Sequence, residues 1–349
     1  MRPRVLAVWL SCVLVVAVVV ALVVDGSAGG APVAVAATST TTTTEPTTTS
    51  TTEPPTTTTT APLPTTTTRP PAPPPTVAVA VAPQRNAVMY SGLGTWIDVY
   101  DWSATFNRGS ERVGPSDVDR MADAGMQTLY VQTSKWDAPD ILEPEHLLPI
   151  IARAKSRGMA VVAWYLPTFE NLQADLSHLL AAGRLQGVDA LAVDIESTKV
   201  ADDAERSRRL VDLSTQLRAA LPNTTLGGIP FPPVVTDVIN PNLWSDFPWQ
   251  AIAPMYDVWM PMSYQTMRKS DSEWRDAYRY TAENIDRLRG HLGPNVMVHI
   301  IGGIADQTTT ADVDGILRAA VERRAIGGSL YDWRTTGAGL YGPLQRFRR

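Results

Sequence analysis

Short apolar runs rich in β-forming residues alternate with longer amphipathic stretches from residue 77 to the C-terminus. Eight such runs occur, at residues 95–100, 127–132, 160–166, 190–196, 225–229, 258–264, 296–301 and 329–333. Strict alternation of strands and helices predicts parallel strands joined by right-handed crossovers. Eight repeats favour an α/β fold of the closed (β/α)₈ (TIM) barrel type. An open dinucleotide-binding sheet is disfavoured, because no glycine-rich loop follows the first run.

Capping residues predict where the intervening helices lie. A helix is expected to begin near Ser116 and to end at Gly125, and another spans residues 146–157 before Gly158. Residues 202–221 and 272–292 form the two longest helical stretches. These positions fit one crossover helix between each pair of successive strands.

The chain before the barrel has two parts of different composition. Arg2 and Arg4 precede an unbroken apolar run at residues 5–24, about the length that crosses a bilayer core. Residues 1–36 are therefore expected to be a signal-anchor or a signal peptide, with a cleavage motif ending at Ala36 as the alternative to retention. Residues 37–86 are rich in Thr and Pro, which predicts an extended, disordered linker.

This organisation predicts an extracytoplasmic location for the barrel domain, residues 87–349. The basic residues before an apolar segment stay in the cytoplasm, and the chain that follows the segment is exported. The domain is thus expected to be membrane-anchored through residues 5–24, or secreted if the chain is cleaved near Ala36.

Charge and composition exclude several classes of partner. The net charge is −5, whereas nucleic-acid binding requires a basic face, so no nucleic acid is expected. The single cysteine, Cys12, lies in the apolar run, and the four histidines lack the spacing of metal ligands. We therefore expect no metal and no cofactor, and a monomeric domain.

The fourth apolar run carries the residues that point most directly to chemistry. It ends in Asp194-Ile195-Glu196, and catalytic groups of (β/α)₈ barrels lie at the carboxyl ends of the strands. Strand side chains alternate, so Asp194 and Glu196 point to the same side. Two adjacent carboxylates raise one another's pKa, which keeps one of them protonated as a general acid. We assign Glu196 as the catalytic acid and Asp194 as its partner.

The other strand ends carry aromatic, amide and carboxylate side chains. Aromatic faces stack on sugar rings, whereas amides and carboxylates bind hydroxyl groups. The candidate substrate-binding residues are Asp98, Trp102, Gln132, Trp164, Tyr264, Gln265 and Trp333. This composition is typical of a carbohydrate site.

The fourth run resembles that of family 18 glycoside hydrolases, the chitinases and their relatives. Their motif D-G-x-D-x-D-x-E matches this chain at Asp189, Asp194 and Glu196, but Ala190 replaces the glycine and Ala192 replaces the innermost aspartate. The resemblance implies a (β/α)₈ barrel in which Glu196 is the acid. It further implies that the acetamido oxygen of the substrate is the nucleophile.

Two later runs extend this resemblance. Residues 260–265, Met-Pro-Met-Ser-Tyr-Gln, are similar to the family's sixth strand and imply that Tyr264 and Gln265 orient the N-acetyl group. Residues 328–333 resemble its eighth strand and imply that Trp333 forms the floor of the sugar subsite. Alternation along this run places Trp333 inward and Asp332 outward.

A second resemblance points to a different mechanism. Family 25 lysozymes also end the fourth strand in D-x-E, and their first strand is similar to residues 96–100, which contain Asp98. Asp98 or Asp194 would then act opposite Glu196, at about 5 Å in a retaining enzyme and about 6.5–9.5 Å in an inverting one. The chain also resembles glycoside-hydrolase-like proteins of actinobacterial cell envelopes.

The sequence thus predicts a cell-surface glycoside hydrolase that acts on an N-acetylated glycan, such as peptidoglycan or a chitin-like polymer. The alternative is a catalytically inactive barrel that binds envelope glycan, because Ala192 removes one acid of the family motif. Release of reducing ends distinguishes the two.

Overall fold

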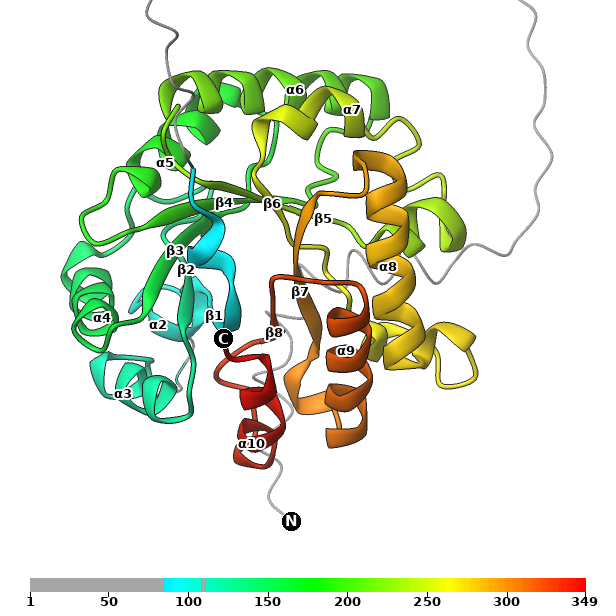
Figure 1. The fold of residues 1–349 in the computed structure, drawn as a ribbon. Coiled ribbons are helices and arrows are strands. Elements are labelled where there is room, and N and C mark those ends of the chain that lie inside the picture. The colour runs from blue at the N-terminus through cyan, green and yellow to red at the C-terminus, as the bar shows by residue number, and fades with distance from the viewer. Residues whose placement is uncertain (1–84, 108, 110) are drawn as a thin grey trace, which may run out of the picture. The chain divides into compact units, whose positions relative to one another are not determined.

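Eight parallel strands close into a barrel in the order β1 to β8 (Figure 1). The computed structural model describes residues 85–107, 109 and 111–349. The strands are β1 (Gly92–Ile97), β2 (Thr128–Gln132), β3 (Ala160–Tyr165), β4 (Ala190–Ile195), β5 (Leu226–Pro230), β6 (Val258–Trp259), β7 (Met297–Ile304) and β8 (Gly327–Tyr331). Strand β1 pairs with both β2 and β8, which closes the barrel. The predicted (β/α)₈ barrel is therefore confirmed.

Helices surround the strands on the outside of the barrel (Figure 1). They are α2 (Val99–Trp102), α3 (Pro115–Asp123), α4 (Pro144–Ser156), α5 (Leu172–Gly183), α6 (Asp203–Ala220), α7 (Trp249–Ile252), α8 (Ala277–Leu292), α9 (Thr310–Glu322) and α10 (Tyr341–Leu344). Within the described residues, α6 and α8 are the longest, as predicted. Helix α8 begins later than expected because Asp276 accepts a hydrogen bond from the Arg279 amide and so caps it.

Three strands differ from their predicted limits for identifiable reasons. Strand β1 starts at Gly92, because glycines that look unfavourable for a strand leave room for neighbouring side chains. A Cβ on Gly94 would lie 2.5 Å from the Tyr130 ring. Strand β6 is short because Pro261 cannot donate a ladder hydrogen bond, and only an isolated bridge from Met262 to Ile301 continues it. Strand β8 ends at Tyr331, where Asp332 accepts hydrogen bonds from Thr335 and starts a turn.

A chain of hydrogen bonds fills the barrel interior. His299 donates from Nδ1 to the Tyr90 carbonyl oxygen at 2.8 Å, and its Nε2 lies 2.9 Å from the Ser329 hydroxyl. That hydroxyl accepts from the Trp96 indole at 2.8 Å. Burial lowers the pKa of His299 to about 4, so the ring is neutral and belongs to the packed core.

The amino-terminal end of the barrel is closed by a short 3₁₀ helix, η1 (Ala87–Tyr90). Tyr90 is fully buried, and its hydroxyl donates to the Leu191 carbonyl at 2.6 Å. The hydroxyl of Thr128, at the start of β2, donates to the Met89 carbonyl. The last residue, Arg349, lies at this end too, because its carbonyl accepts from the Gln127 side chain. Both ends of the described barrel therefore meet the amino-terminal ends of the strands.

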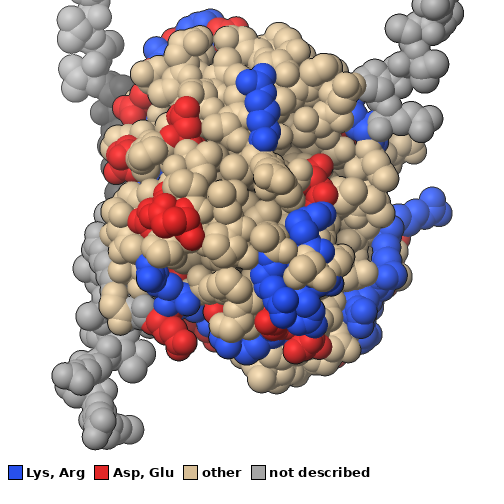
Figure 2. All heavy atoms as spheres, turned by 90° about the vertical axis from the view of Figure 1, so that its left-hand side faces the viewer, with Lys and Arg blue, Asp and Glu red and all other residues tan. Residues whose placement is uncertain are grey.

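The outer surface of the barrel mixes charges of both signs. On the face shown in Figure 2, basic and acidic groups lie close together. Ion pairs join α3 to α4 through Asp119, which contacts both Arg153 and Arg157. The predicted anchor at residues 5–24 and the predicted linker up to residue 84 lie outside the described residues. No helix in the part of the chain that the structure describes is long and apolar enough to span a membrane.

Candidate functional site

Strand β4 positions an acid pair at the carboxyl end of the barrel. Asp194 is the fifth residue of β4 and is 7% exposed, and Glu196 follows the end of the strand and is half-buried. Ala192, fully buried, precedes them on the same side of the strand. The Oδ1 atom of Asp194 is buried without a hydrogen-bond partner among the described residues. The pair therefore combines a desolvated carboxyl with a more accessible one beside it.

Burial governs the protonation of this pair. It raises the pKa of Glu196 to about 7. It also raises the pKa of Asp194 well above its usual range, and the negative charge of Glu196 raises it further. The two groups titrate together, so a proton is retained on the pair close to neutral pH. That is the property required of a general acid.

Tyr264 lies in the field of the same carboxyls. It follows β6 and is half-buried at the start of a 3₁₀ turn. Burial raises the pKa of its phenol well above the usual value, and the charges of Glu196 and Asp194 raise it further. The phenol therefore stays protonated and can donate a hydrogen bond. The structure thus brings together Asp194, Glu196 and Tyr264.

Several buried polar groups near the ends of the strands lack partners. Gln265 is fully buried, and neither its Oε1 nor its Nε2 has a hydrogen-bond partner within the described residues. The same is true of the Trp164 indole N–H at the end of β3. Unsatisfied buried polar atoms are rare in folded proteins and call for a bound molecule or water. Trp164 and Gln265, both predicted to bind substrate, are thus available to do so.

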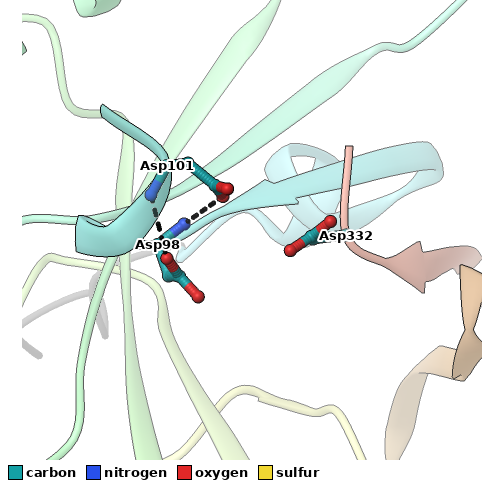
Figure 3. Close-up of side chains that lie close together, drawn as sticks. All are labelled: Asp98, Asp101 and Asp332. Carbon is teal, nitrogen blue, oxygen red and sulfur yellow. Dashed lines mark hydrogen bonds between the residues drawn. The ribbon is translucent and has the colours of Figure 1, made fainter. Parts of the chain in front are cut away.

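A second group of carboxylates assembles beside β1 and β8. Figure 3 shows Asp98 and Asp101, at the start of α2, with Asp332, which follows β8. All three are buried, and one oxygen from each lies within 4.8 Å of the others, a spacing that could hold a metal ion. Burial raises the pKa of all three, and that of Asp332 to about 6. The sequence predicted no metal site from the spacing of its histidines; this cluster was missed because Asp332 is distant in the chain from Asp98 and Asp101.

Asp98 is already hydrogen-bonded at both carboxylate oxygens. Its Oδ1 accepts from the Tyr100 and Asp101 amides and caps α2, and its Oδ2 accepts from the Tyr331 hydroxyl at 2.7 Å. The Asp101 carboxylate accepts from the Asp98 amide, which completes a capping box. Arg334 lies 3.6 Å from Asp101. These contacts hold the Asp98 carboxylate beside Asp101 and Tyr331.

Two other predicted substrate-binding residues, Gln132 and Trp102, join α2 to β2. The side-chain oxygen of Gln132 accepts from the Val99 amide at 3.1 Å. The indole of Trp102, which is 1% exposed, donates to the Gln132 carbonyl at 3.1 Å. The side-chain oxygen of Gln132 and the indole N–H of Trp102 are therefore engaged within the protein.

The structure places Trp333 away from the acid pair. Because β8 ends at Tyr331, the alternation that predicted an inward Trp333 does not continue to it. The Trp333 ring is 5% exposed and stacks on Tyr341 with centroids 5.5 Å apart. Asp332, predicted to face outward, is instead buried beside Asp98. The inward side chain at this end of β8 is Tyr331, whose hydroxyl reaches Asp98.

Tyr331 is a site residue that the sequence analysis missed. Its ring centroid lies 6.3 Å from that of Tyr264 and 6.5 Å from that of Trp96. It therefore links the acid pair's tyrosine to the carboxylate cluster. The alternation of Gly327, Ser329 and Tyr331 could have identified it, had the strand been ended two residues earlier.

Comparison with known proteins supports the fold. No family model matches the chain, and no curated protein matches it. A family 18 chitinase from Cycas revoluta, solved with allosamidin, is 13% identical with a TM-score of 0.53, covering 73% of this chain and 98% of that one. A class V chitinase from Pseudomonas fluorescens is 10% identical with a TM-score of 0.54, covering 73% and 99%. The spore cortex-lytic enzyme SleL from Bacillus megaterium is 8% identical with a TM-score of 0.53, covering 74% of each chain.

At these identities the likeness concerns the barrel fold. It bears out the resemblance to family 18 chitinase-like barrels that the fourth, sixth and eighth strands indicated.

Proposed function

We propose that this protein is a glycoside hydrolase that acts on an N-acetylated glycan of the chitin or peptidoglycan type. The observation that carries the proposal is Glu196, a half-buried acid whose pKa burial raises to about 7, directly above the buried Asp194. Of the three solved structures compared above, two are chitinases and one is a cortex-lytic enzyme, which supports the choice of substrate class.

The proposed reaction uses a group of the substrate as the nucleophile. Glu196 donates its proton to the glycosidic oxygen as the bond from that oxygen to the anomeric carbon breaks, and the acetamido oxygen bonds to the same carbon. Water then attacks this carbon, releases the acetamido oxygen and returns a proton to Glu196. Asp194 accepts a hydrogen bond from the acetamido N–H and so orients the acetamido group. Tyr264 donates a hydrogen bond from its phenolic hydroxyl to the acetamido oxygen. This route needs no second attacking carboxylate, which agrees with the engagement of Asp98 in its own cluster.

The direct test is release of reducing ends by the full chain from chitin oligosaccharides and from purified peptidoglycan. We expect turnover of at least one of these two substrates. Purified protein that binds them without any turnover would exclude hydrolysis of these glycans. It would support the alternative of a glycan-binding barrel, for which the specific observation is Ala192 at the position of the family's innermost acid.

Activity should decline as the pH rises through about 7. A general acid must carry its proton, and burial raises the pKa of Glu196 to about 7, so the acid is protonated below that pH and lost above it. An unperturbed glutamic acid would already be ionised above about 4.3. The measurement is kcat/KM on a chitin oligosaccharide between pH 4 and pH 9. A plateau that extends to pH 9, or a decline centred near pH 4, would show that Glu196 is not the acid.

A further inference from the structure

Trp136 is an unusual side chain for this barrel because it is 50% exposed. It lies in the loop between β2 and α4, at the same end of the barrel as Glu196. Among the large apolar side chains that the described residues expose, it is the one aromatic. An exposed indole leaves a large apolar surface in contact with water, which is unfavourable. Such exposure at the mouth of a barrel calls for a partner.

Buried hydrogen bonds hold the loop that carries Trp136. His178 on α5 is 5% exposed, and its Nε2 donates to the carbonyls of Lys135 and Ala138 at 3.0 and 3.1 Å. These carbonyls flank Trp136 in the chain. The Ser134 hydroxyl donates to the Pro139 carbonyl and closes the same loop. The exposed indole is thus held in place by buried hydrogen bonds, as a binding surface requires.

Charged side chains from the next two loops meet the indole. The Lys199 ammonium lies 3.4 Å from the centroid of the Trp136 ring, a cation–π contact. It also lies 3.4 Å from Glu170 Oε2. Glu170 follows β3, and Lys199 follows β4 only three residues beyond Glu196. Three consecutive loops therefore place an aromatic side chain, a donor and an acceptor together at the same end of the barrel as Glu196.

We propose that Trp136, Lys199 and Glu170 form an outer sugar subsite, which binds a pyranose ring of the same glycan chain at a distance from the bond that is cleaved. The apolar C–H face of the pyranose stacks on the face of the indole that Lys199 does not cover, and hydroxyl groups at its edge bind Lys199 and Glu170. This inference rests on the proposed function and extends it. The enzyme then prefers long chains, because only they reach both Glu196 and Trp136.

The test compares short and long substrates in the full-length protein. We expect Trp136→Ala to lower the ratio of kcat/KM for chitin hexamer to that for dimer by about tenfold, since one stacked ring contributes up to roughly 1.5 kcal/mol. Trp136→Phe should restore most of this ratio. A parallel series with short and long peptidoglycan glycan strands shows which polymer uses the subsite. Leu148→Ala, on the outer face of α4 and 39% exposed, is the matched control and should leave the ratio unchanged.

Binding separates this inference from the proposed function. In the Glu196→Gln background, calorimetry should show that Trp136→Ala weakens hexamer binding by about tenfold. If the wild type does not hydrolyse the glycans but this loss of binding occurs, the subsite stands and the hydrolase does not. If hydrolysis occurs and the ratio and the affinity are both unchanged in Trp136→Ala, the subsite is overturned. Absence of both binding and hydrolysis overturns both.

Discussion

Replacing Glu196 with glutamine should reduce hydrolysis of N-acetylated glycans by about 10²–10⁴-fold while glycan binding persists. Glutamine keeps the shape of the side chain but has no proton to give to the leaving oxygen. The measurement is the single-turnover rate on chitin oligosaccharides, with affinity determined separately. Asp194→Asn should also lower the rate, because an amide cannot share a proton with Glu196. If Glu196→Gln kept the wild-type rate, the acid would lie elsewhere, even in an active enzyme.

The free energy of unfolding of Glu196→Gln, measured against pH, shows whether this variant folds. The pKa of Glu196 is raised in the folded state, so the group contributes stability below its unfolded pKa and loses it as the pH rises through about 7. Glutamine does not ionise, so Glu196→Gln keeps this stability at high pH. Its free energy of unfolding should exceed that of the wild type at pH 8 by roughly 2 kcal/mol. The difference should vanish near pH 4. A variant less stable than the wild type at pH 8 would contradict the burial of this carboxylate.

Gly327→Ala should destabilise the barrel by roughly 2–4 kcal/mol. A Cβ at Gly327, the first residue of β8, would lie 2.6 Å from the Gly92 carbonyl oxygen and 2.7 Å from that of Tyr90. It would also lie 2.6 Å from His299 Nδ1. Two of these atoms belong to the backbone and cannot rotate away, so β1 and the closing helix η1 must shift together. Denaturant unfolding followed by tryptophan fluorescence measures the loss.

A matched glycine shows that the effect is steric. A Cβ at Gly290, within α8, would meet nothing within 4 Å. Alanine there should raise the free energy of unfolding by about 0.5–1 kcal/mol, because glycine is a poor helix former. Equal effects of Gly327→Ala and Gly290→Ala would show that the contacts around Gly327 relax without cost.

The sequence predicts the barrel because each of its elements is locally consistent. Strand β4 is recognisable from its apolar run, and alternation alone places Asp194 and Glu196 on one side of it. The location of the acid pair at the end of the fourth strand follows from the same pattern. These features need no information from distant parts of the chain.

The features that the sequence could not supply depend on where elements end and on what distant segments bring together. Trp333 lies two residues beyond the end of β8, where the turn at Asp332 breaks the alternation. The meeting of Asp98 and Asp332 requires closure of the barrel between β1 and β8. The exposure of Trp136 depends on His178, a residue of the following crossover. The last two features depend on residues that are distant in the sequence, so local patterns do not predict them.

The 3₁₀ helix η1 packs against the amino-terminal end of the barrel, whereas Asp194 and Glu196 lie at the carboxyl end of β4. The described part of the chain therefore begins at the end of the barrel opposite to Glu196. If the chain is attached to a surface through the segment before residue 85, the attachment and a glycan bound at Glu196 meet the barrel at opposite ends, so neither blocks the other.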